Sequence, residues 1–146
     1  MKNVNFILGF ALLSMVAISC KKEEGCTDKS ASNFSETAEK DDGSCKYKGS
    51  VVFWYDALTA LLMSAEGIES LTFYVDGAIV GSTAASVYWD SAPSCGANGT
   101  ITVEKDLGAS KSKSFTYSIV DNFDDEIWGG TSSFEANTCK KLVLNP

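Results

Sequence analysis

Two residue types are missing from this chain, which has no histidine and no arginine. Histidine is the commonest general base, so its absence excludes Ser–His and Cys–His nucleophile pairs and removes the most frequent zinc ligand. The 12 basic residues, all lysines, are outnumbered by 19 acidic residues, and the formal net charge is −7. Nucleic-acid binding depends on basic patches that neutralise phosphates. We therefore expect neither a nucleic-acid partner nor an enzyme.

A hydrophobic run of about 20 residues, the length needed to cross a bilayer, is also missing. The longest apolar run covers residues 6–18, with Lys2 before it and small residues at its end. This arrangement is typical of a secretory signal peptide. A buried core helix is the alternative, but such a helix would alternate polar and apolar faces. We therefore assign residues 1–19 to a signal peptide.

The end of that run, Ala17-Ile18-Ser19-Cys20, resembles the lipobox of bacterial lipoproteins. The resemblance implies cleavage before Cys20, lipidation of Cys20, and an outer-membrane lipoprotein that contacts the membrane through its lipid anchor. The alternative is ordinary secretion with a free thiol at Cys20. The charged residues that follow, within 20–24, are similar to the surface-export signals of Bacteroidetes lipoproteins, which implies exposure at the cell surface. They are also suited to a simple solvated tether.

A small module bounded by two cysteines is expected at residues 25–47. It resembles a short repeat of Bacteroidetes surface proteins in the segments Gly25-Cys26-Thr27-Asp28, Ala31-Ser32-Asn33-Phe34 and Ala38–Cys45. Such a short segment cannot bury a core of its own, so a Cys26–Cys45 bond would serve as its staple. Oxygen-bearing side chains that could gather around calcium, the one candidate cofactor, are Asp28, Asn33, Asp41 and Asp42. The alternative is that they cap turns.

The remaining segment, 49–146, shows a period of two in several short stretches: apolar and polar residues alternate in 71–76, 100–104 and 115–119, and Val51, Phe53 and Tyr55 alternate with Val52 and Trp54. Turn signals separate the stretches at Asp76-Gly77, Ala97-Asn98-Gly99, Leu107-Gly108 and Gly129-Gly130. This pattern predicts an all-β protein, a small antiparallel β-sandwich preceded by the stapled module. The segment also resembles prealbumin-like sandwiches of the carboxypeptidase-regulatory and PEGA types, in the run Leu71–Gly77 followed by Val80-Gly81.

Cys26, Cys45, Cys95 and Cys139 form an even set once Cys20 carries lipid, and an exported chain favours disulfides. Three pairings are open to four cysteines. We predict Cys26–Cys45 and Cys95–Cys139, because the two modules look self-contained.

One segment, residues 56–67, interrupts the strand pattern with Leu58, Leu61 and Leu62 at helical spacing. A short helix or a loop is expected there. We predict that its leucines cap one end of the sandwich, and the alternative is an apolar contact loop for a partner.

Candidates for chemistry are few. Ser110–Lys113 offers serine and lysine, but a solvated strand edge explains the lysines better. Asp124-Asp125-Glu126 is interpreted as an acidic turn rather than a glycosidase pair. Trp54, Trp89 and Trp128 would bind sugars if they formed an exposed row, and otherwise belong to the core. We therefore predict a non-catalytic surface lipoprotein that acts as an interaction or accessory module, with a carbohydrate-binding lipoprotein as the alternative and a protein or glycan as the partner.

Overall fold

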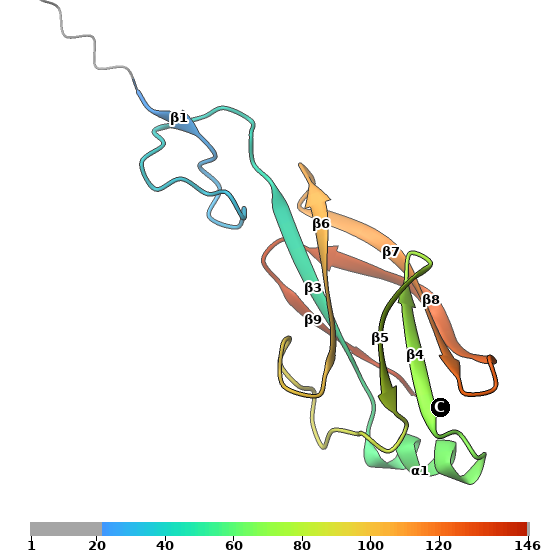
Figure 1. Ribbon diagram of the computed structural model, residues 1–146. Coiled ribbons are helices and arrows are strands. Elements are labelled where there is room, and N and C mark those ends of the chain that lie inside the picture. The colour runs from blue at the N-terminus through green and yellow to red at the C-terminus, as the bar shows by residue number, and fades with distance from the viewer. Residues whose placement is uncertain (1–21, 146) are drawn as a thin grey trace, which may run out of the picture.

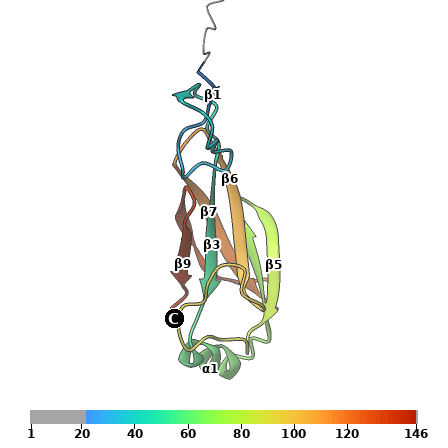
Figure 2. The same ribbon diagram turned by 90° about the vertical axis from the view of Figure 1, so that its left-hand side faces the viewer.

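The computed structural model describes residues 22–145, and Figure 1 shows that they form an elongated molecule. The cysteine-bounded module lies at one end, the helix α1 (Ala57–Ala65) lies at the opposite end, and two β-sheets lie between them; Figure 2 gives the same arrangement from the side. The predicted signal peptide, residues 1–19, and the predicted lipidation site, Cys20, lie outside the described residues. Among residues 22–145, no helix is long and apolar enough to span a membrane.

The sandwich consists of two sheets, with the strand orders β6-β3-β9 and β5-β4-β7-β8. Its strands are β3 (Tyr47–Trp54), β4 (Ser70–Val75), β5 (Ala78–Ala84), β6 (Ile101–Gly108), β7 (Ser112–Asp121), β8 (Glu126–Glu135) and β9 (Cys139–Val143). Neighbouring strands are antiparallel except for β9, which runs parallel to β3. The predicted all-β sandwich is confirmed, and the parallel pair is a feature that the sequence pattern did not indicate.

The module is built around a disulfide instead of a core. Cys26 and Cys45 are bonded, as predicted, and both are buried. Two short strands, β1 (Glu24–Gly25) and β2 (Lys40–Asp41), pair in parallel. The carbonyl of Glu23 accepts hydrogen bonds from the N–H groups of residues 39 and 40, so the module begins within the predicted charged tether. At its other end the module runs directly into β3, which starts at Tyr47.

The core lies between the two sheets and follows the predicted alternation. Leu71, Phe73 and Val75 of β4 are fully buried, whereas the residues between them are half-buried. The Phe53 ring of β3 meets Phe73 across the sandwich, with 5.6 Å between the ring centroids. A Phe73→Ala change would remove about 3–5 kcal/mol of stability at such a site. The strand pattern was therefore a reliable guide to the inner faces.

The outer face of β3 departs from that pattern, because Val52 is as buried as the core residues. Segment 85–100, the yellow loop in front of β3 in Figure 2, covers this side of the sheet. The predicted disulfide between Cys95 and Cys139 ties the segment to the first residue of β9. The N–H of Trp89 also donates to the carbonyl of Tyr55, at 3.0 Å. A covered outer face explains why apolar residues continue through 51–55 without a polar position.

One predicted turn is wrong. Gly129 and Gly130 lie inside β8, paired with β7, and do not separate two strands. A β-carbon at position 130 would come within 3.2–3.4 Å of the Tyr117 side chain, so glycine here makes room for a ring on the neighbouring strand. The real turn is acidic: the Asp121 carboxylate accepts from the N–H groups of residues 123 and 125. The other predicted turns stand, and Asp76-Gly77 joins β4 to β5 with both residues at positive φ.

The helix α1 corrects another expectation. Asp56 is its N-cap, and its carboxylate accepts from the N–H of Thr59 at 2.9 Å. The side of the helix turned to the sandwich carries small or flexible residues, Thr59, Ala60 and Met63, which are buried. The predicted capping leucines are exposed to solvent instead. Small side chains let the helix approach the end of the sandwich closely, and the leucines therefore lie on its outer side.

Candidate functional site

The predicted calcium ligands do not form a ligand set. Within the described residues, no three acidic or cysteine side chains lie close enough together to hold a metal ion. Asp41 and Asp42 each accept a hydrogen bond from the backbone N–H two residues ahead. The amide of Asn33 bonds to the carbonyl of Ser44 and to the N–H of Lys46. These side-chain oxygens accept hydrogen bonds within turns, which was the alternative to calcium binding.

Asp28 connects the module to the sandwich. One carboxylate oxygen accepts from the N–H and the hydroxyl of Ser30. The other oxygen accepts from the Tyr47 hydroxyl at 2.9 Å and lies 2.6 Å from Nζ of Lys111. The hydrogen bond from Lys111, followed by those from Ser30 and Tyr47, holds the pKa of Asp28 well below its usual range. An ammonium group already bound to this carboxylate opposes any cation there.

Lys111 is solvated, as predicted, with its side chain 66% exposed, but it does not lie on a strand edge and it makes a contact that the sequence did not indicate. It precedes β7, which is an inner strand of the four-stranded sheet. Its Nζ also lies 5.9 Å from the centroid of the Tyr47 ring, and its bond to Asp28 raises the pKa of Lys111. Of the two lysines in the serine–lysine stretch considered for catalysis, Lys111 is therefore already bound to a carboxylate.

A polar cleft of about 410 Å³ opens beside this junction. Its lining comes from both parts of the chain: residues 29–32 of the module, residues 48–50 of β3, Glu104, and residues 137–139. Lys48 and Glu104 form an ion pair at 2.7 Å in the cleft wall. The lining is mainly polar, and its one carboxylate, Glu104, is paired with Lys48, so the cleft provides no facing pair of carboxylates.

The three tryptophans do not form an exposed row. Trp54 and Trp89 are half-buried where segment 85–100 covers β3, and both line a space of only about 10 Å³. Trp128 lies elsewhere, stacked on Tyr55 with 6.2 Å between the ring centroids. Its ring N–H donates a hydrogen bond to the carbonyl of Asn145. Burial between Trp128 and the core raises the pKa of Tyr55 to about 12. These rings are mainly packing residues.

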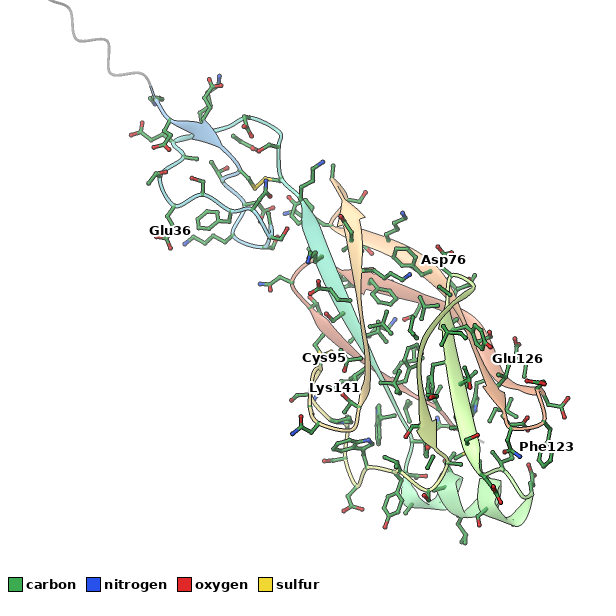
Figure 3. The ribbon with its side chains drawn as sticks, viewed as in Figure 1. Glu36, Asp76, Cys95, Phe123, Glu126 and Lys141 are labelled. Carbon is green, nitrogen blue, oxygen red and sulfur yellow. A yellow bond between two sulfur atoms is a disulfide. The ribbon has the colours of Figure 1, made fainter. Side chains whose placement is uncertain are left out.

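The exposed apolar side chains gather at the far end, on α1. Leu58, Leu61 and Leu62 are 59%, 65% and 43% exposed. Two grooves flank the helix, of about 310 Å³ against Trp128 and about 390 Å³ against Tyr88. Figure 3 shows the side chains at this end and places Phe123, on the nearby β7–β8 turn, pointing outward as well. Among the described residues, Leu58, Leu61, Leu62 and Tyr88 at this end are four of the eight exposed large apolar side chains.

The acidic turn predicted at Asp124-Asp125-Glu126 is present as the β7–β8 connection. Glu126, labelled in Figure 3, lines a pocket of about 370 Å³ with residues 116–118, and the pocket lining contains no second carboxylate. Comparison of the chain with protein-family models, with curated proteins and with solved structures gave no match.

Proposed function

We propose that this chain is a lipid-anchored protein of the outer cell surface, whose β-sandwich binds another protein without catalysing a reaction. The observation that carries the proposal is the placement of the two ends. The chain enters the described part at the module, and the exposed leucines of α1 lie at the opposite end (Figures 1 and 2). An anchor at Cys20 would therefore leave α1 as the part farthest from the membrane along the long axis.

The cross-links within the described part support the same role. The module is stapled by Cys26–Cys45, and the ion pair between Asp28 and Lys111 holds it against the sandwich. Two disulfides suit a chain exported to an oxidising compartment. These cross-links join the module to the sandwich and keep α1 at the far end of the described part.

Two measurements on intact cells of a lipoprotein-processing bacterium test the proposal. Mass spectrometry of the mature chain should find lipid on Cys20, and a Cys20→Ala control should lack it. A photo-crosslinking amino acid placed at position 36, 61 or 79 should yield a discrete protein adduct from at least one position. An unmodified Cys20 would refute the anchor, and no adduct from any of the three positions would refute the binding role.

A further inference from the structure

The exposed leucines form one continuous ridge. Leu58, Leu61 and Leu62 are spaced i, i+3, i+4 and so share one face of α1. Leu61 borders the groove that Tyr88 also lines, and Leu62 borders the groove on the other side. Tyr88 is itself 48% exposed. We call these four side chains the distal patch.

The rim of the distal patch is acidic. Asp56 caps the start of α1, Glu66 caps its end, and Glu69 follows the turn after it. Hydrogen bonds from the backbone N–H and the hydroxyl of Thr59 lower the pKa of Asp56, so this carboxylate is charged at neutral pH. The sequence has no lysine between Lys48 and Lys105.

The lysines lie elsewhere. Lys29, Lys40 and Lys46 belong to the module at the opposite end, and Lys111 is paired with Asp28. Lys141 of β9 reaches the carbonyl of Ala92, in the segment that also carries Tyr88, and the helix itself has no basic residue in its last turn. The apolar ridge therefore lies in a field of negative charge.

We propose that the distal patch binds a basic amphipathic segment of a partner protein, a proposal that rests on the binding role proposed above. Apolar side chains of that segment enter the two grooves beside the leucine ridge, and its lysines or arginines meet Asp56 and Glu66 at the rim. A second copy of this chain docked end to end would place the same acidic rims against each other. An anionic membrane surface would be repelled for the same reason.

The test measures binding of a labelled amphipathic peptide to the full-length lipoprotein in neutral detergent. The peptide has about 18 residues, with leucines at helical spacing and lysines at all other positions. Its counterpart carries glutamate in place of every lysine. The lysine peptide should bind, more weakly as salt is raised, and the glutamate peptide should not.

Matched variants locate the binding. Leu61→Ser should weaken it about tenfold, whereas Ile79→Ser on β5 should leave it unchanged, although the two side chains are almost equally exposed at 65% and 66%. Glu66→Lys should weaken it as well, and Glu36→Lys in the module, labelled in Figure 3, should not. Size-exclusion chromatography of the lipoprotein in detergent should show no dimer that depends on Leu61, so Leu61→Ser should leave the elution volume unchanged.

Any of three results would overturn the inference. The lysine and glutamate peptides could bind equally well, the Leu61 and Ile79 variants could weaken binding equally, or a dimer could be present that is lost in Leu61→Ser. Its failure is distinct from that of the proposed function. If the lysine peptide does not bind while the crosslinker at position 36 or 79 yields an adduct, the binding role stands and the distal patch is not its surface.

Discussion

Removal of each disulfide should destabilise a different part of the protein. Cys95–Cys139 joins residues 44 apart and Cys26–Cys45 joins residues 19 apart. Loop-closure entropy assigns about 4 kcal/mol to the first bond and about 3 kcal/mol to the second. The first bond fixes segment 85–100 over β3 and holds the start of β9, so the double alanine variant should lose about 4 kcal/mol of the sandwich's free energy of unfolding. The second bond lies in a module with little apolar surface of its own.

Tryptophan fluorescence during urea unfolding separates the two effects, because all three tryptophans lie in the sandwich. For an m-value near 2 kcal/mol/M, removal of Cys95–Cys139 should lower the midpoint by roughly 2 M. Removal of Cys26–Cys45 should leave the midpoint nearly unchanged. Amide hydrogen exchange should then show that residues 23–46 lose protection while the sandwich strands keep theirs.

Equal shifts of the tryptophan midpoint for the two double variants would refute this reasoning. Such a result would mean that the module and the sandwich unfold as one cooperative unit. The contacts that would transmit that coupling are the Tyr47 side chain, which belongs to one buried cluster with Cys26, Cys45 and the sandwich core, its bond to Asp28, and the ion pair of Asp28 with Lys111. Asp28→Asn in the background that lacks Cys26–Cys45 is the control, since it removes the ion pair.

Three further outcomes follow from particular contacts. Met63→Ala should cost about 2–3 kcal/mol in a thermal or urea unfolding experiment because Met63 is buried, whereas Leu61→Ala on the outer side of α1 should cost less than about 0.5 kcal/mol. Gly49→Ala should cost about 1–3 kcal/mol in the same experiment, because its β-carbon would lie 2.5 Å from a backbone oxygen at the end of β8. The lowered pKa of Asp28 means that its contribution to module docking is present above its ordinary pKa of 3.8 and is lost as the pH falls below it. The protection of the module's amides, relative to their intrinsic exchange rates at each pH, should therefore fall in acid, and Asp28→Asn should remove that pH dependence.

The inner faces of the sandwich could be predicted because the alternation of residue types within a single strand identifies the side that is buried. Leu71, Phe73 and Val75 alternate with half-buried residues, and the period of two identifies the inward side without knowledge of the partner sheet. The disulfide pairing could be predicted for a related reason, since each bond stays within one self-contained part of the chain. The turn at Gly129-Gly130 could not, because glycine within a strand and glycine in a turn look the same until the neighbouring Tyr117 ring is placed.

The contact between the module and the sandwich could not be predicted from the sequence, for a different reason. Asp28 and Lys111 are far apart in the chain, and neither stands in a motif that indicates a partner. An acid in a turn-rich segment suggests a turn cap or a metal ligand, and a lysine between serines suggests a solvated position. Only the path of β3 into the module brings the two charges within 2.6 Å.

For the helix α1, hydrophobicity alone predicts the wrong buried face. In residues 57–65 two sets of side chains have helical spacing: the three leucines, and the set Thr59, Ala60 and Met63. Hydrophobicity alone favours burial of the leucines, as the sequence reading assumed. A helix that must close the end of a thin sandwich, however, approaches more closely with small side chains than with large ones, and Thr59 adds a hydroxyl bond to the Asp56 cap at 2.9 Å. Leaving the leucines in water has a cost of roughly 1.5 kcal/mol or more for each side chain relative to full burial. Covering this acidic end with the partner proposed above would remove that cost.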